Sequence, residues 1–142
     1  MSVTIARSVD DVFLVLTTPE DTPKWSASAV DERLTSPGPV GVGSTRHATV
    51  RTFGGRTTTN ETIVTAFEPN RRVAMRTVTA RVPFEAAWSF TPVAGGTRVD
   101  WAWSFELRGV ARLFGPPFAA YFRRSLRRDL ARLKAMMEAR EL

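Results

Sequence analysis

The sequence predicts an α+β domain: a seven-stranded antiparallel sheet, two short helices after the first strand, and a long C-terminal helix. Three observations support this prediction. Hydrophobic residues alternate with polar ones through much of residues 28–107, which is typical of half-buried strands. Glycine and proline turn signals interrupt the alternation at intervals that suit a meander. After residue 117 the hydrophobic period becomes helical and remains so almost to the C-terminus.

The length and composition fit one globular domain over residues 1–142. Hydrophobic residues make up 43% of the chain and charged residues 24%, so we expect an ordinary folded core. The chain has no cysteine and one histidine, which excludes disulfides, thiol nucleophiles and the common zinc centres. We therefore predict no metal site and no cofactor. No secretory signal or membrane span is visible at the N-terminus or beyond, and a cytoplasmic location is expected.

The net charge of +6 is weak evidence about function. All but two of the basic residues are arginine. Such a charge is compatible with an anionic partner, either nucleic acid or membrane. A codon bias toward arginine in a GC-rich genome is the favoured explanation. Charge alone therefore identifies no partner.

The N-terminal elements are a strand and two short helices. A strand pattern covers residues 3–6, and Ser8 followed by Asp11 has the spacing of a capping box. This cap predicts a helix over residues 9–16. Thr18 and Pro19 have the pattern of a second helix start, and that helix is expected to end near Trp25.

The central region contains the six other predicted strands, and two of them have a one-sided aromatic face. Alternate positions from Phe84 to Phe90 are large or small apolar residues, and the same holds from Val99 to Leu107. Gly54 and Gly55 suit a two-residue hairpin, since glycine reaches positive φ without strain. The strands are expected near residues 28–35, 43–53, 56–67, 71–79, 82–91 and 97–107.

The last helix follows the breaker Gly115-Pro116-Pro117 and has one apolar stripe, which runs from Phe118 to Met137 at steps of four and three residues. Arginines occupy other sides of the helical wheel. Asp129 lies at the edge of the apolar stripe.

Several short motifs occur in the order found in one superfamily. They are the opening Ile5–Phe13, the glycine-rich stretch Gly38–Ser44, the turn Glu68–Arg71, and the hairpin from Phe90 to Val99. With these motifs the chain resembles the SRPBCC superfamily, and within it the polyketide cyclase/dehydrase-like branch. The resemblance implies the helix-grip fold, a curved sheet wrapped around the C-terminal helix with an apolar cavity between them. It does not imply one function, because the superfamily includes lipid carriers, cyclases and other ligand binders.

The resemblance and the aromatic strands together predict a binding site for a hydrophobic small molecule: a lipid, a polyketide or an aromatic metabolite. The alternative for each aromatic residue is plain core packing. The predicted cavity residues are Trp25, Phe84, Trp88, Phe90, Trp101, Trp103, Phe105, Phe118, Phe122 and Leu126.

A second hypothesis is an enzyme of the cyclase, aromatase or dehydratase kind, with one side chain that moves protons. His47 is one candidate, because imidazole exchanges protons near neutral pH. Its alternative is a solvent-facing strand residue. Asp129 is another, and its alternative is a surface pair with Arg132. Glu61 is the weakest candidate, and no motif shows that a reaction is catalysed.

A third hypothesis is an interaction module or toxin-like regulator that uses the basic face of the last helix. Arg124 and Arg128, with their neighbours Arg123 and Arg127, could make weak contact with an anionic membrane. A solvated helix face is the alternative. No aromatic side chains interleave with these arginines, which disfavours a nucleic-acid platform. The sequence does not indicate the oligomeric state.

Overall fold

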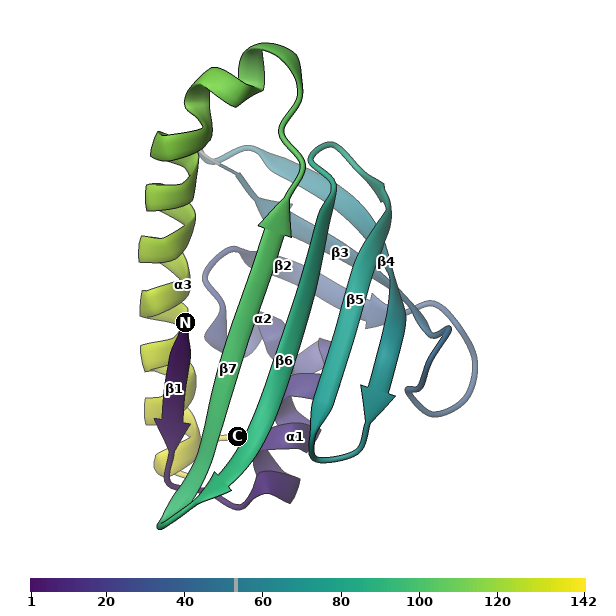
Figure 1. Cartoon of the computed structure of the whole chain (residues 1–142). Coiled ribbons are helices and arrows are strands. Elements are labelled where there is room, and N and C mark those ends of the chain that lie inside the picture. Colours follow the sequence, from purple (N-terminus) through teal and green to yellow (C-terminus); the bar gives the residue numbers. More distant parts are fainter. Residues whose placement is uncertain (53) are drawn as a thin grey trace.

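A computed structural model describes residues 1–52 and 54–142 and has the predicted α+β architecture (Figure 1). Within these described residues, three α-helices and two 3-10 helices (η) accompany one seven-stranded sheet. The predicted strand over residues 43–53 is shorter in the structure, and its last residue, Phe53, lies outside the described residues. The elements are β1 (Ser2–Ile5), α1 (Val9–Thr17), η1 (Pro19–Asp21), α2 (Thr22–Trp25), β2 (Ala29–Leu34), β3 (Thr45–Arg51), β4 (Thr57–Glu68), β5 (Arg72–Ala80), β6 (Phe84–Val93), β7 (Gly96–Phe105), η2 (Gly109–Phe114) and α3 (Gly115–Glu138).

The sheet has the strand order β1-β7-β6-β5-β4-β3-β2, and all its neighbours are antiparallel. Strands β2 to β7 form a meander, and β1 returns to the edge beside β7. The sheet curls so that β2 and β3 lie behind β6 and β7, with α3 along the open side (Figure 1). This is the helix-grip arrangement that the sequence motifs predicted.

One face of β6 and β7 is buried and the other is exposed to solvent, as the alternation predicted. Trp88 lies opposite Trp101, and Ala86 opposite Trp103, so that large rings gather on the inner face. Glu85 and Ser104 form one of the outward pairs. The inner face of these two strands therefore supplies one wall of the space beneath α3.

The two halves of α3 are packed differently. Its C-terminal half buries Leu130, Leu133 and Met137 against the core. No residue from 115 to 128 is fully buried, although Phe118 and Phe122 point toward the sheet and contact its aromatic rings. Core packing thus fixes the second half of the helix, while large side chains hold the first half away from the strands.

The main hydrophobic core lies beneath the C-terminal half of α3. Ile5, Val12, Val99, Leu133 and Met137 have no exposed surface there. Gly96 permits the close approach of β7 to the end of β1, because a Cβ at this position would lie 2.1 Å from the carbonyl oxygen of Ile5. This packing ties the first strand to the last one.

The structure differs from the prediction before the last helix. Residues Gly109–Phe114 form η2, which the sequence pattern did not indicate. The helix α3 then begins at Gly115, inside the segment that was expected to be a breaker. Proline fits there because the first helical turn needs no backbone N–H donor. None of the helices in the described part of the chain is long and apolar enough to cross a membrane.

Candidate ligand-binding site

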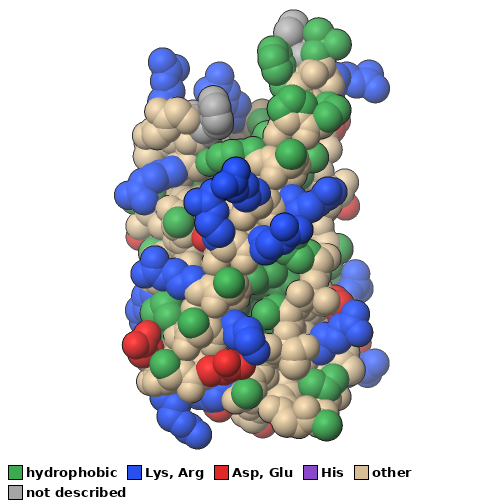
Figure 2. Space-filling model, turned by 90° about the vertical axis from the view of Figure 1, so that its left-hand side faces the viewer, with side chains coloured by type: hydrophobic (Ala, Val, Ile, Leu, Met, Phe, Trp, Pro, Cys, Tyr) green, Lys and Arg blue, Asp and Glu red, His purple; other side chains and the backbone are tan. Residues whose placement is uncertain are grey.

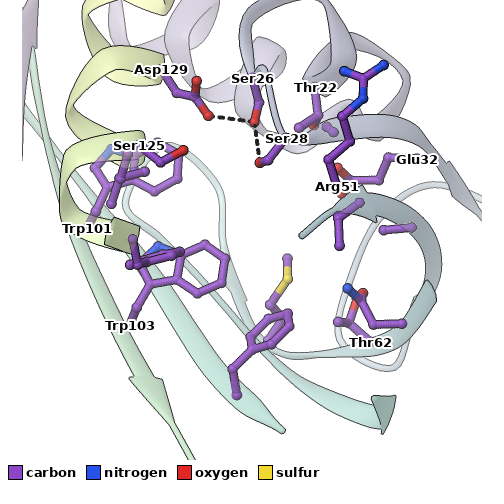
Figure 3. Close-up of a pocket in the computed structure, with 18 of the residues that line it drawn as sticks. Thr22, Ser26, Ser28, Glu32, Arg51, Thr62, Trp101, Trp103, Ser125 and Asp129 are labelled. Carbon is purple, nitrogen blue, oxygen red and sulfur yellow. Dashed lines mark hydrogen bonds between the residues drawn. The ribbon is translucent and has the colours of Figure 1, made fainter. Parts of the chain in front are cut away.

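A cavity of about 300 Å³ lies between the inner face of the sheet and the N-terminal half of α3 (Figure 3). Its volume is at the lower end of the range of small-molecule pockets, about 300–1,000 Å³. All four tryptophans of the chain contribute to its wall. The predicted residues that line it are Trp25, Phe84, Trp88, Trp101, Trp103, Phe105, Phe118, Phe122 and Leu126.

The tryptophans form a chain of edge-to-face contacts rather than a stack. Ring centroids are 6.0 Å apart for Trp25 and Trp101, 5.2 Å for Trp88 and Trp101, and 6.2 Å for Trp88 and Trp103. Phe122 of α3 meets Trp103 edge to face at 5.2 Å. Within the described residues, none of the four buried indole nitrogens has a hydrogen-bond partner. Edge-to-face packing sets the positively polarised edge of one ring against the face of the next, which offsets part of that cost.

Phe90 does not belong to this cavity, and its predicted place there is wrong. It shares the inner face of β6 with Trp88, but it lies nearer the end of β6 that packs on α1. Its ring packs edge to face on Phe13 of α1, with centroids 5.0 Å apart. The alternation of β6 assigns Phe90 to the correct face, whereas its position along the strand places it in the core.

Asp129 forms a buried polar cluster with the segment that joins α2 to β2. Its carboxylate accepts hydrogen bonds from the Ser26 hydroxyl at 2.7 Å and from the Ala27 backbone N–H at 3.1 Å. The Ser28 hydroxyl lies 3.2 Å from that of Ser26 and extends the cluster into the cavity (Figure 3). Asp129 is 6% exposed, so the expected surface pair with Arg132 is not formed.

An ion pair between the partly buried Glu32 of β2 and the buried Arg46 of β3 forms a second polar part of the wall. Another guanidinium nitrogen of Arg46 lies 3.9 Å from the sulfur of Met75, and its Nε has no partner among the described residues. Burial raises the pKa of Glu32, against the opposing effects of Arg46 and of a hydrogen bond from Thr22. This carboxyl group therefore exchanges its proton at a higher pH than an exposed glutamate.

Sequence reasoning missed Glu32 and Arg46, although a signal for Arg46 was present. Arg46 shares its strand face with Ala48 and Val50, and all three line the cavity. An arginine on the apolar face of a strand requires a buried partner. For Glu32 the signal is absent, because β2 reads Ala-Val-Asp-Glu-Arg-Leu and has no clear alternation.

The other two predicted acid/base candidates lie outside the cavity. His47 and Glu61 are directly opposite each other on β3 and β4, with His47 Nδ1 3.0 Å from a Glu61 carboxylate oxygen. Neither lines the cavity. The structure thus brings these two together on the outer face of the sheet and separates them from Asp129.

The cavity reaches the surface between α3 and the ends of β2 and β3. Arg51 and Tyr121 both line it and are both exposed. One guanidinium nitrogen of Arg51 donates to the Ala27 carbonyl at 3.2 Å, which joins β3 to the start of β2 beside this mouth. The site as a whole is an aromatic chamber with two polar clusters and an arginine at its mouth. Such a chamber suits a flat or flexible apolar molecule that carries a few polar atoms.

The fold and the cavity define a helix-grip protein of the SRPBCC superfamily. The family model described as "Polyketide cyclase / dehydrase and lipid transport" matches residues 1–138, and the chain belongs to this family. An uncharacterized protein of Mycobacterium tuberculosis is 31% identical over 143 residues, which cover 98% of this chain and 83% of that protein.

Solved structures share the fold at low sequence identity. The di-domain ARO/CYC StfQ of the steffimycin biosynthetic pathway has a TM-score of 0.77 at 18% identity, over 99% of this chain and 50% of StfQ. DR_A0006 of Deinococcus radiodurans has a TM-score of 0.71 at 22% identity, over 98% and 95% of the two chains. Ara h 8.0201 has a TM-score of 0.66 at 13% identity, over 92% and 93%.

Proposed function

We propose that this protein binds a hydrophobic small molecule, of the aromatic, polyketide or lipid type, in the cavity beneath α3. The observation that carries the proposal is the wall of four tryptophans and four phenylalanines in one chamber. A family described by polyketide cyclase/dehydrase and lipid transport supports it. Binding would come from burial of apolar ligand surface, about 25 cal/mol per Å² before ordering costs.

The polar clusters would set the orientation of the ligand. Ser28 and the Ser26–Asp129 pair lie on one side of the chamber, and Glu32 and Thr62 lie on another (Figure 3). Arg46 pairs with Glu32 and also lines the chamber. A ligand with oxygen atoms at two places along an apolar body would meet both clusters. A saturated hydrocarbon has no polar atoms and could form hydrogen bonds with neither cluster. We therefore expect oxygenated aromatic or poly-keto molecules to bind more tightly than alkanes of the same size.

The first test is intrinsic fluorescence, since every tryptophan of the chain lines the cavity. The neutral dye N-phenyl-1-naphthylamine should quench this emission as it binds. In the variant Ala48→Phe a phenyl ring would occupy the chamber and weaken binding at least about tenfold. The matched control is Ala102→Phe, which adds the same ring on the exposed face of β7. Equal affinity in the two variants would contradict the proposal.

A native mass spectrum and an organic extract of the purified protein then identify the ligand class. A compound that co-purifies with the unmodified protein and not with Ala48→Phe would be the cavity ligand. A compound retained by both proteins would be bound elsewhere.

A second candidate function, acid/base catalysis on a poly-keto chain, is favoured by the partly buried Glu32. Burial raises its pKa, and its position in the cavity suits a group that passes a proton to or from a bound ligand. Cyclisation and dehydration of a short poly-keto thioester would give a product one water lighter. Turnover should be lost in Glu32→Gln and retained in His47→Gln. Turnover that needs neither Glu32 nor Asp129 would exclude this mechanism.

A further inference from the structure

The outer face of α3 carries a group of arginines without acidic partners. Arg123, Arg124, Arg127 and Arg128 are all exposed, and none forms an ion pair within the described part of the chain. The sole acidic residue between positions 107 and 137 is Asp129, whose carboxylate is buried against Ser26 and Ala27. Figure 2 shows basic side chains gathered over the middle of this face. The surface therefore presents uncompensated positive charge.

An exposed apolar tip lies at the N-terminal end of the same helix. Leu113 is 78% exposed and Phe114 is 63% exposed, and they are consecutive residues at the end of η2. The turn that contains them lies at the upper end of the molecule in Figure 1, beyond the ends of the strands. Two adjacent large apolar side chains that are mostly exposed favour contact with an apolar phase or partner.

The tip is continuous with the mouth of the cavity. The helix α3 begins directly after Phe114, and its next aromatic residues Phe118, Tyr121 and Phe122 line the chamber. Tyr121 is both a cavity residue and 45% exposed. An apolar molecule that moves between the tip and the chamber would thus travel along side chains of one helix.

We propose that η2 and the outer face of α3 dock this protein on an anionic lipid bilayer. Leu113 and Phe114 enter the interfacial region, and the arginines lie against the headgroups. A nucleic acid would neutralise the arginines and leave the two apolar side chains in water. A second copy of this chain would bring like charges together. A bilayer with anionic headgroups pairs with the arginines and also accommodates the two apolar side chains. Docking does not require a ligand in the cavity.

Vesicle flotation tests the proposal. The protein should float with vesicles of phosphatidylglycerol and phosphatidylcholine, and not with vesicles of phosphatidylcholine alone. The double variant Arg124→Gln, Arg128→Gln should lose about fivefold in affinity for each arginine removed. Its control is Arg72→Gln, Arg76→Gln, which removes the same charge from exposed positions of β5. This control should bind as the unmodified protein does.

Insertion of the apolar tip into the bilayer can be measured separately. The chain has no cysteine, so one introduced cysteine provides a single labelling site. An environment-sensitive dye on Leu113→Cys should shift to the blue on the anionic vesicles. The same dye on Val78→Cys, an exposed position of β5, should not shift. Replacement of both Leu113 and Phe114 by serine should weaken flotation at least about tenfold.

Three results would overturn the proposal. The first is failure of the unmodified protein to float with anionic vesicles at low salt. The second is flotation that depends on Arg124 and Arg128 while the dye at Leu113 remains in water, because the contact is then purely electrostatic. The third is tighter binding to RNA than to vesicles without any dependence on Leu113 and Phe114, which would identify the arginines as a nucleic-acid surface.

Discussion

Replacement of Asp129 by alanine should destabilise the protein far more than loss of an ordinary helix-surface aspartate. The carboxylate accepts two hydrogen bonds, from the Ser26 hydroxyl at 2.7 Å and from the Ala27 N–H at 3.1 Å, and the residue is 6% exposed. Hydrogen bonds to charged groups contribute about 1.5–3 kcal/mol each. The Ser26 hydroxyl can turn to Ser28 and regain part of this loss. We therefore expect Asp129→Ala to lower the free energy of unfolding by about 2–4 kcal/mol.

Urea unfolding followed by circular dichroism measures this change, with an unchanged slope as the sign of an intact native state. In a thermal melt the same loss corresponds to a decrease in Tm of about 10 °C for a domain of this size. Asp129→Asn keeps one acceptor oxygen and should lose about 1–2 kcal/mol. The control is Asp31→Ala, because Asp31 and its partner Arg33 are both more than half exposed. This control should stay within about 0.5 kcal/mol of the unmodified protein.

A double-mutant cycle of Ser26→Ala and Asp129→Ala isolates the bond between α3 and the α2–β2 connection. We expect a coupling energy of about 1–2 kcal/mol. If Asp129→Ala cost no more than the Asp31 control and the coupling were near zero, the carboxylate would not hold α3 beside the cavity, and the reasoning would be refuted.

Three further predictions concern pH, packing and the outer face of the sheet. Burial raises the pKa of Glu32, so above pH 4.5 the folded protein still holds this proton while the unfolded chain releases it. The free energy of unfolding should therefore fall as the pH rises from 4.5. In urea titrations at different pH values, Glu32→Gln should flatten this slope. Gly96→Ala would bring a Cβ to 2.1 Å from the Ile5 carbonyl oxygen, so thermal melts should show a loss of about 3 kcal/mol or more, and a neutral result would contradict the packing at β1. His47→Gln should leave the affinity for N-phenyl-1-naphthylamine unchanged, since the ring pairs with Glu61 outside the cavity; weaker binding would argue against that placement.

The fold was largely predictable because its signals are local. Alternation at Trp88, Trp101 and Trp103 assigned the inner face of β6 and β7, and the Ser8 cap located the first helix. The segment Gly109–Phe114 was missed because a single 3-10 element has no hydrophobic period, and its exposed Leu113 and Phe114 follow no pattern.

The aromatic wall of the site was also predictable, while its polar clusters were not. Trp101 and Trp103 belong to the cavity because their strand face is fixed by alternation. The partner of Asp129 lies 103 residues away in sequence, at Ser26, so only the tertiary structure brings them together. Glu32 and Arg46 depend on the register of β2 against β3, which a polar strand does not reveal.

The place of β1 beside β7 has a consequence for how the chain folds. Residues Ser2 to Ile5 pair with Thr97 to Asp100, so the first strand of the sheet can pair only after the last strand, β7, has been synthesised. The hairpins from β2 to β7 can form sequentially from near neighbours, whereas sheet closure brings together residues nearly a hundred positions apart and should limit the folding rate. Until α3 is also synthesised, the tryptophan-rich face has no cover, and this interval is when the nascent protein is most prone to aggregate.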